Sequence, residues 1–458
     1  MLVRAAMQPM GATYIAAELS FRYTQAMRET DGLPPAAHVA PREQAGAVGR
    51  HDVVIVGAGP AGSTAATLLA ALGHDVVAVD RAHFPRHKPC AEYMSPEIAA
   101  VLDRLGITDQ AMALRHARLR GFRIMAPGGR SFLADFAGCG HLSPAGGHEF
   151  GLAQDRGTFD HLLVRHARTQ GATVREGFTV QDVLPADERG LVGVRGRGGD
   201  GGPLELRCRV LIAADGLHSV VARRLNLMRP WRFGPRKIAL VAHLADVGGL
   251  DDYGEMHVLP DGAYCGLAPL GGGVTNVAAV VDATEGQHIK GRREAYFMEH
   301  LARYPALSGR LVGARITRPV LAIGPLAFRV RRRVAGQALL VGDATGFYDP
   351  FTGEGIYRAM RAAELAAEVI HAALAQPDQA SLIRALATYE QRYRREFAGK
   401  RLVEIIVHAV ISRPWLFDRV ASRLAQRKTL ADTLVGVTGD FVSPWAVLKP
   451  TYLARLLL

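Results

Sequence analysis

The sequence predicts an α/β protein with a parallel sheet, a second, largely antiparallel unit inserted into it, and helices at the C-terminal end. Three segments support this fold class. Each contains an apolar run, a turn with glycine and a helical pattern: His51–Ala82, Arg209–Leu225 and Leu339–Ile356. Short continuous apolar runs are typical of parallel strands that are buried on both faces. The three segments therefore predict strand–turn–helix units of one sheet.

The first segment contains a complete G-x-G-x-x-G pattern. It follows the apolar run Val53–Val56 and opens an Ala/Leu-rich helix that ends at Gly73, and its glycines are Gly57, Gly59 and Gly62. A second strand ends at Asp80, 23 residues after Gly57, where an acid can accept hydrogen bonds from a ribose. A small-residue turn without a ligand is the alternative. Because strand, helix, second strand and acid are all in place, we favour a Rossmann-like dinucleotide site.

The third segment, LLVGDATGFYDPFTGEGI, suits an anionic group beside a polyhydroxyl chain. The strand Ala338–Val341 precedes Asp343, and a Pro/Gly-rich turn opens a helix near Gly353. Such a turn directs free N–H groups and the positive end of a helix dipole at one point. Asp343 can only accept hydrogen bonds, which suits hydroxyl groups. Taken alone, the segment could also be an ordinary turn of an α/β fold.

The second segment, RVLIAADGLHSVVARRL, is less specific. Its strand ends in Asp215-Gly216, and Ser219 and Arg223 follow on a helix. Taken alone, Asp215 is best interpreted as a helix N-cap.

Together, the three segments resemble the FAD-dependent oxidoreductases of the para-hydroxybenzoate hydroxylase type, whose FAD domain is of the glutathione reductase type. The resemblance covers about His51 to Ala375. It implies that FAD is the cofactor and that NAD(P)H is the reductant. The implied cofactor-binding residues are Gly57, Gly59, Gly62 and Asp80 at the ADP half, Asp343 at the ribitol, Gly353 and Gly355 at the flavin pyrimidine, and Arg81, Arg156, Asp215, Gly216, Pro350, Glu354 and Ile356 nearby.

The segment FPRHKPCAEYMSPE, Phe84–Glu97, narrows the resemblance to one branch of this group. It resembles the F-P-R-x-K-P-C-G-E/G motif of the geranylgeranyl reductase branch, although Ala91 stands where glycine is usual. Aromatic hydroxylases of the group have histidine at the position of Gly346, and the aromatic P-x-x-Y-x-W-x-F-P signature of the reductases is not visible. Cys90 ends the first FAD segment. We therefore predict that it lies at the active face of the flavin as a catalytic residue; the alternative is a small buried residue.

Three functions follow from these patterns. The first is reduction of C=C bonds in a hydrophobic, isoprenoid-like or lipid-like substrate, as in geranylgeranyl and menaquinone-chain reductases. The second is a monooxygenase that hydroxylates or epoxidises a hydrophobic aromatic, quinone or polyketide substrate. The third, from another class, is a non-catalytic flavin-binding protein, which the intact cofactor segments disfavour.

Composition limits the partners. The formal net charge is +12, but only six of the 55 basic residues are lysine, which indicates a compositional bias toward arginine. The densest cluster, Arg329 with Arg331–Arg333, is interpreted as a solvated loop. No aromatic pattern of a nucleic-acid-binding fold accompanies these charges, so we expect no nucleic-acid partner. The isolated cysteines, Cys90, Cys139, Cys208 and Cys265, predict a reducing, cytoplasmic environment with neither a disulfide framework nor a metal site.

We expect a discontinuous domain organisation. Residues 1–50 form a flexible extension without the apolar core of a signal peptide. The FAD-binding domain comprises 51–90, 151–224 and 335–380, the substrate domain comprises 91–150 and 225–334, and 381–458 is a helical C-terminal region. Two elements are specific predictions: a helix Ser95–Leu105 capped by Ser95, and an antiparallel meander within Glu255–Asp282 that covers the flavin.

The C-terminal apolar residues leave two interpretations open. The residues between Leu402 and Phe417 have helical spacing, which suits either core packing or a bilayer interface. The second interpretation predicts peripheral association with the inner face of the membrane. No apolar run approaches the roughly 18 residues of a spanning helix.

Overall fold

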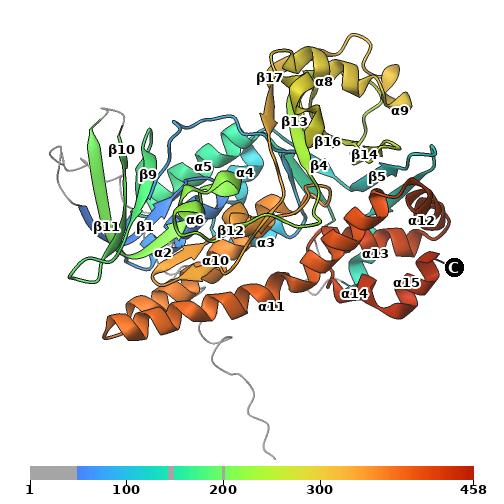
Figure 1. Ribbon diagram of the computed structural model, residues 1–458. Coiled ribbons are helices and arrows are strands. Elements are labelled where there is room, and N and C mark those ends of the chain that lie inside the picture. Colours follow the sequence, from blue (N-terminus) through green and yellow to red (C-terminus); the bar gives the residue numbers. More distant parts are fainter. Residues whose placement is uncertain (1–48, 143–148, 199–201, 458) are drawn as a thin grey trace, which may run out of the picture.

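The computed structural model describes residues 49–142, 149–198 and 202–457, and its strands form two large and two small sheets (Figure 1). The expected N-terminal extension lies outside the described residues up to position 48. Gly49 and Arg50, which were assigned to it, already belong to β1 (Gly49–Val56).

The first large sheet brings the three cofactor segments together. Its order is β19–β20–β11–β1–β2–β8, and β1 pairs in parallel with β11 and with β2. The bounds are β2 Val76–Val79, β8 Thr173–Arg175, β11 Pro203–Ala213, β19 Val334–Ala335 and β20 Ala338–Leu340. An antiparallel pair, β9 Thr179–Leu184 and β10 Val192–Arg197, extends the sheet from β11. Because β1, β11 and β20 are parallel neighbours, the turns that follow them lie at one edge.

Four helices pack with the first sheet: α2 Pro60–Ala71, α5 Arg156–Thr169, α10 Gly355–Leu374 and α11 Gln379–Ile411. Apolar side chains of α2, α10 and the first half of α11 form one core with the strands, from Val53 in β1 to Phe397 in α11. A short helix, α6 Val220–Arg224, lies on the other face, where Val221 packs against Leu211 and Val54. The sheet is therefore covered on both faces, as its apolar strands require.

The second large sheet is mainly antiparallel, in the order β17–β13–β16–β15–β14–β5–β6. Its strands are β5 Gly121–Met125, β6 Ser131–Asp135, β13 Lys237–Ala245, β14 Tyr253–Val258, β15 Tyr264–Pro269, β16 Val274–Asp282 and β17 Arg315–Ile323. The expected meander is confirmed, since β14, β15 and β16 pair antiparallel in sequence order. Three helices pack beside it: α7 Gly286–Ile289, α8 Arg293–Leu301 and α9 Pro305–Ser308.

Two three-stranded sheets connect these units. One contains β3 Tyr93–Met94, β7 Gly151–Gln154 and β4 His116–Leu119; the other contains β12 Met228–Arg229, β18 Phe328–Val330 and β21 Gly346–Phe347. The prediction of a helix starting at Ser95 was wrong, because α3 spans Ile98–Arg104 and has no side-chain cap. Ser95 instead accepts a hydrogen bond from Ile98 N through its backbone carbonyl, at 3.0 Å. A short helix, α4 Thr108–Ala113, follows.

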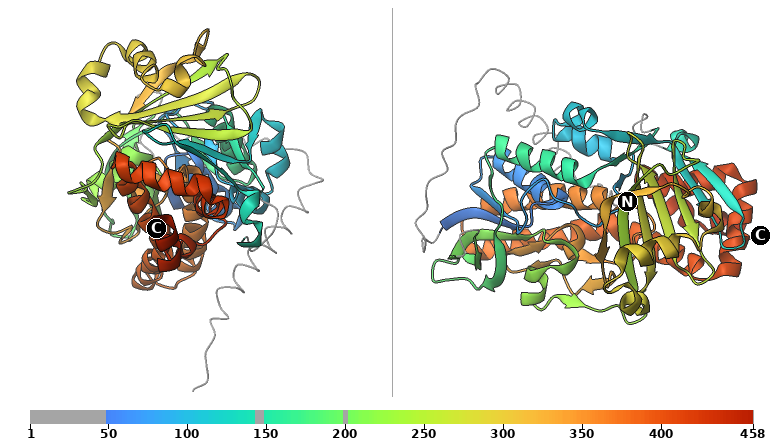
Figure 2. Two further views of the ribbon diagram at one scale, coloured as in Figure 1. Left: turned by 90° about the vertical axis from the view of Figure 1, so that its right-hand side faces the viewer. Right: turned by 90° about the horizontal axis from the view of Figure 1, so that it is seen from above.

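The predicted helical C-terminal region is present and continues beneath both units. After α11 come α12 Pro414–Gln426, α13 Lys428–Thr438, α14 Trp445–Leu448 and α15 Pro450–Leu457. Figure 2 shows the second sheet lying over these helices. The long helix α11 begins at Gln379, directly after the loop 375–378 that follows α10, and runs along both units (Figure 1).

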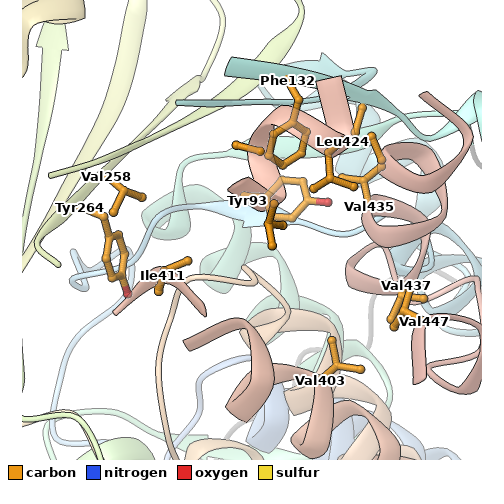
Figure 3. Packing of buried hydrophobic residues seen from close by; sticks show 14 of the residues in the cluster. Tyr93, Phe132, Val258, Tyr264, Val403, Ile411, Leu424, Val435, Val437 and Val447 are labelled. Atoms are coloured by element: carbon orange, nitrogen blue, oxygen red, sulfur yellow. The ribbon is translucent and has the colours of Figure 1, made fainter. Parts of the chain in front are cut away.

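Some of the C-terminal apolar residues pack in the core, and others are exposed as a bilayer interface would require. Val403, Ile411 and Phe417 are buried in the core between the second sheet and the helices. Figure 3 shows Val403 and Ile411 in this core from close by. In contrast, Trp415 is 68% exposed and Leu402 is 43% exposed. No helix among the described residues combines the length and apolar character needed to cross a membrane.

Candidate functional site

A large cavity lies where the carboxyl edge of the first sheet meets the second sheet. Together with its open mouth, it encloses about 1430 Å³ not filled by protein atoms. Ten of the residues predicted from the sequence line it: Gly59, Cys90, Arg156, Gly216, Asp343, Pro350, Gly353, Glu354, Gly355 and Ile356. Five do not line it: Gly57, Gly62, Asp80, Arg81 and Asp215. The two groups have different local environments.

A Cβ atom would have different neighbours at each of the three glycines of the G-x-G-x-x-G turn. Gly57 has φ +98°, and a Cβ atom there would lie 2.4 Å from the carbonyl oxygen of Ala214. A Cβ atom on Gly62 would lie 1.8 Å from the carbonyl oxygen of Gly57. Gly57 is therefore required by the close approach of the chain that follows β11, and Gly62 by the close approach of α2 to the turn before it. A Cβ atom on Gly59 would meet only the flexible end of Arg86, at 3.3 Å.

Two glycines at the cavity have no rigid neighbour in front of them, which leaves room for a ligand. Gly59 and Gly355 both line the cavity, and outside its own helix and chain neighbours no described atom lies within 4 Å of a Cβ atom built on Gly355. The protein's own packing thus does not require glycine at either position. A ligand that approaches the backbone closely does require it, and both positions adjoin a helix N-terminus, which favours phosphate or other negative charge. The residues present therefore fit a dinucleotide cofactor.

Asp80 holds the glycine turn in place. Its Oδ2 atom accepts a hydrogen bond from Ala58 N at 2.9 Å, and its Oδ1 atom accepts one from Ala82 N at 2.9 Å. Arg81 is exposed. Sequence reasoning missed Arg86, whose guanidinium lies 4.0 Å from Asp80 and 3.4 Å from Asp160. The arginine of the F-P-R-x-K motif was the signal that could have identified it.

The Asp215-Gly216 turn combines capping with an unsatisfied acceptor. Asp215 Oδ2 accepts hydrogen bonds from Val220 N at 2.7 Å and Val221 N at 3.3 Å, while Ser219 is the N-cap residue of α6. The capping interpretation of Asp215 is confirmed in part: Asp215 is the N-cap residue of the short 3-10 helix Gly216–His218, and its side chain accepts from the first N–H groups of α6, whose own N-cap residue is Ser219. Asp215 Oδ1 is buried and has no hydrogen-bond partner among the described residues. Burial raises the pKa of this carboxyl group.

The segment after β20 supplies most of one side of the cavity. Asp343, Pro350 and the residues from Gly353 to Ile356 all line it. Gly353 has φ +74°, and a Cβ atom there would lie 2.7 Å from the ring of Tyr93. Lys88, which sequence reasoning missed, also lines the cavity. Burial lowers the pKa of Lys88, and the negative charge of Asp343 partly offsets this.

Cys90 lies at the junction of the cofactor segments and the second sheet. It is half-buried and lines the cavity. Asn276 of β16 donates a hydrogen bond to the carbonyl oxygen of Cys90 at 2.9 Å. Arg156, which forms a two-point ion pair with Asp160 at 2.7 and 2.8 Å, lies beside it. Burial alone would lower the pKa of Arg156, but the charge of Asp160 and the contact with Cys90 raise it.

Sequence reasoning also missed a buried polar cluster behind Cys90. Glu92, which is fully buried with φ +60°, bonds to His243 Nε2 at 2.5 Å, to an Arg318 guanidinium nitrogen at 2.8 Å and to Asn276 Nδ2 at 2.8 Å. Burial raises the pKa of Glu92, but these partners outweigh it and lower the pKa overall. Glu92, His243 and Asp155 lie close enough to share a metal ion. Arg318 already supplies positive charge there, 3.8 Å from Asp155.

Comparisons with known proteins agree with this geometry. Residues 50–404 match the family described as FAD binding domain. The chain is 31% identical to menaquinone reductase of Mycobacterium tuberculosis over 372 residues, 78% of this chain and 84% of the relative. It is also 31% identical to digeranylgeranylglycerophospholipid reductase of Methanothrix thermoacetophila over 359 residues, 77% of this chain and 85% of the relative.

Solved structures share the fold. The myxobacterial chondrochloren halogenase has a TM-score of 0.69 at 27% identity, covering 78% of this chain and 82% of its own. A geranylgeranyl bacteriochlorophyll reductase-like protein from Thermoplasma acidophilum has a TM-score of 0.63 at 22% identity, covering 90% of this chain and 96% of its own. The chain belongs to the FAD-binding-domain family, as a para-hydroxybenzoate hydroxylase-type FAD-dependent oxidoreductase of the geranylgeranyl reductase branch.

Proposed function

We propose that this protein reduces C=C bonds of a hydrophobic, isoprenoid-like substrate. The observation that carries this proposal is the apolar side of the cavity that faces the cofactor segments. The second sheet and the chain that follows it contribute only aliphatic side chains there: Ala239, Val241, Ala278, Val280, Ile323 and Leu326. A lipid-like chain gains free energy from burial against such a surface. The two relatives at 31% identity, which are named menaquinone and digeranylgeranylglycerophospholipid reductases, support the same substrate class.

We assign the ADP half of FAD to the turn around Gly59, the ribitol to Asp343 and the flavin pyrimidine to Gly353–Gly355. When bound, FAD supplies the redox chemistry. The N–H groups at the start of α10 and the ammonium group of Lys88 would hold negative charge at the cofactor. Asp215 Oδ1, which is buried without a partner, is available to accept a hydrogen bond from the cofactor or from a bound water.

Cys90 is proposed to face the reacting part of the substrate, because it lines the cavity between the cofactor segments and the apolar side. NAD(P)H is proposed as the reductant. Mixing the oxidised, FAD-loaded protein with NADH or NADPH without oxygen tests this directly. Bleaching of the flavin absorbance by either nucleotide supports it, whereas bleaching by dithionite alone contradicts it.

The reaction itself is tested with the chemically reduced protein and menaquinone or a geranylgeranyl lipid. Anaerobic formation of a product with added hydrogen, detected by mass spectrometry, is the expected result. The Gly59→Val variant, which we expect to lack FAD, serves as the control. Incorporation of isotopically labelled oxygen in air would instead establish a monooxygenase. If the FAD-loaded protein converts neither menaquinone nor a geranylgeranyl lipid, without oxygen or in air, both the reductase and the monooxygenase functions are contradicted.

A lipid-like substrate also implies contact with a membrane, and we propose peripheral association with its inner face. Three large apolar side chains at the surface support this: Phe233, Trp415 and Trp445 are 88%, 68% and 62% exposed. Co-flotation of the purified protein with lipid vesicles tests the association. A protein that stays entirely in the aqueous fraction at low salt would contradict it.

A further inference from the structure

One surface combines unpaired positive charge with an exposed aromatic ring. It lies on β12, β18 and the segments that follow each of them, and we call it the basic–aromatic patch. Its members are Arg229, Trp231, Arg232, Phe233, Arg329, Arg331 and Arg332. Phe233 is 88% exposed, the largest exposed fraction among the large apolar side chains that the structure describes as exposed.

The arginines of the patch lack acidic partners. No carboxylate of the described residues lies within ion-pairing distance, 4.0 Å, of any of the five. The neighbouring Arg333, in contrast, pairs with Glu390 at 2.8 Å. Arg229 and Arg329 also stand directly opposite each other in the antiparallel pair β12–β18. Like charges in this arrangement are destabilising. A loop that is merely solvated does not account for this accumulation, whereas an anionic partner would offset its cost.

The aromatic residues indicate which kind of anionic partner fits. The Arg232 guanidinium lies 5.3 Å from the centre of the Phe233 ring, and Arg329 lies 5.9 Å from that of Trp231. A soluble anion would use the arginines but would leave Phe233 in water. A bilayer accepts both groups, because anionic headgroups attract arginine and the acyl boundary buries an aromatic ring.

The patch adjoins the cavity. Trp231 Nε1 donates a hydrogen bond to the carbonyl oxygen of Phe347 at 3.2 Å, and Phe347 of β21 lines the cavity. Leu326 also lines the cavity, and its backbone N–H donates a hydrogen bond to the carbonyl oxygen of Lys237 at 3.0 Å. Lys237 follows shortly after Phe233 in the sequence. A bilayer that bound the patch would therefore lie close to the apolar side of the cavity.

We propose that the basic–aromatic patch docks this protein onto an anionic lipid bilayer, with Phe233 inserted among the lipids and the arginines at the headgroups. The inference deepens the proposed function by naming the docking face. A substrate with a hydrophobic chain would then pass between bilayer and cavity over a short distance.

Vesicle binding tests the proposal without turnover. The FAD-loaded protein is incubated with phosphatidylcholine vesicles that contain or lack phosphatidylglycerol, and the bound fraction is measured by sedimentation. We expect binding that requires phosphatidylglycerol and weakens with salt. Neutralising one patch arginine should cost about fivefold in affinity, and the double variant Arg232→Gln/Arg329→Gln about twentyfold or more. Phe233→Ser should weaken binding independently of salt, whereas the matched controls Arg315→Gln and Val312→Ser, which lie elsewhere on the surface, should not.

A second readout reports insertion directly. Phe233→Trp should show a blue-shifted emission and quenching by brominated acyl chains on vesicle binding, relative to the parent protein. Equal binding by the patch variants, or its loss in Trp415→Ser instead, would overturn the proposal. Displacement by millimolar inorganic phosphate would identify a soluble-headgroup site and also overturn it. Because none of these measurements uses a substrate, failure of the reductase reaction remains a separate result.

Discussion

The ammonium group of Lys400 lies 3.0 Å from Oε1 of Glu354, joining the middle of α11 to the residue that precedes α10. Lys400 also lies 2.9 Å from Asp440, which follows α13. All three side chains are buried, and burial raises the pKa of Glu354 and of Asp440 although the charge of Lys400 partly offsets it. The C-terminal helices thus fix the glycine segment that lines the cavity.

Lys400→Met should therefore destabilise the protein and weaken FAD binding. It leaves two buried acids without a cation, and breaking such a contact costs about 3–5 kcal/mol. Urea unfolding and fluorescence titration with FAD measure the two effects. Adding Asp440→Asn should recover part of the stability, and Lys449→Met, at an exposed position, should change neither property. An unchanged free energy of unfolding in Lys400→Met would show that the contacts of Lys400 with Glu354 and Asp440 do not stabilise the protein.

The glycine turn allows the fold to be separated from cofactor binding. Gly59→Val should fold normally but lose FAD, because its side chain meets only the end of Arg86 and points into the cavity. Gly62→Ala should destabilise even the FAD-free protein, because its Cβ atom would lie 1.8 Å from Gly57 O. Circular dichroism melting and bound flavin content distinguish the two variants. Gly309→Ala, in open space, is the control. Stoichiometric FAD in Gly59→Val would place the ADP half elsewhere.

Sequence reasoning predicted the local backbone geometry where the signal is local. The glycine turn, Asp80 and the segment from Asp343 to Ile356 each form within a single strand–turn–helix unit, so spacing alone reveals their geometry. Arg86 was missed for a related reason. The chain turns after Asp80, and only the folded path shows that the later arginine returns toward Asp80 and Asp160.

Contacts between distant elements left no such signal. The Glu92 cluster joins residues separated by 151, 184 and 226 positions, and each of its members is unremarkable in its own segment. Glu92 needs His243 and Arg318 as partners because its carboxylate is buried in the folded chain. The residues around Glu92 in the sequence do not reveal this burial. The start of α3 was misplaced because Ser95 has the composition of a cap, while its backbone carbonyl rather than its hydroxyl forms the contact.

Stability should fall at low pH through Glu255. Burial raises the pKa of this carboxyl group, but His257 and Arg310 outweigh burial and lower it from 4.5 to about 2. The contribution, on the order of 3 kcal/mol, is present above about pH 4.5 and is lost as the pH falls toward about 2. Denaturant unfolding of Glu255→Gln should therefore differ from the parent protein at neutral pH, and the difference should shrink through this window.

An exposed pair provides the control for this pH dependence. Glu205, which pairs with Arg195 at the surface, should show little effect when changed to glutamine. A difference between Glu255→Gln and the parent protein that stays constant down to about pH 2 would contradict the assignment.

Cys90 should be the cysteine that reacts in the native protein. Burial raises the pKa of Cys139 to about 11 and that of Cys208 to about 12, and Cys265 is also fully buried. Thiolates, not thiols, are alkylated. Iodoacetamide labelling followed by peptide mass spectrometry should find one modified site, absent in Cys90→Ser and protected by FAD. Labelling of a second cysteine at the same rate, or no protection, would contradict the position given to Cys90.

A chain of polar side chains leads from the surface of α11 to the cavity. His408 Nδ1 lies 3.1 Å from Asp349 Oδ2, and Asp349 Oδ1 accepts a hydrogen bond from the Tyr264 hydroxyl at 2.7 Å. Asp349 lines the cavity and is buried, while His408 Nε2 contacts Ser412 Oγ at 3.3 Å on the exposed side. Saturating a double bond consumes a proton, and we predict that this contact series delivers it from solvent.

His408→Gln should consequently slow substrate saturation by about tenfold to a hundredfold, because proton supply then limits the reaction. FAD content and melting temperature should stay close to those of the parent protein, since the side chain lies at the rim of the core. Added imidazole should restore part of the rate in this variant, and the rate should acquire a larger solvent deuterium effect. Ser412→Ala, which removes only the outer hydroxyl, should have a smaller effect. If His408→Gln turns over at the parental rate and does not respond to imidazole, protons reach the cavity by another route, and Asp349 serves only to hold the segment between β21 and α10.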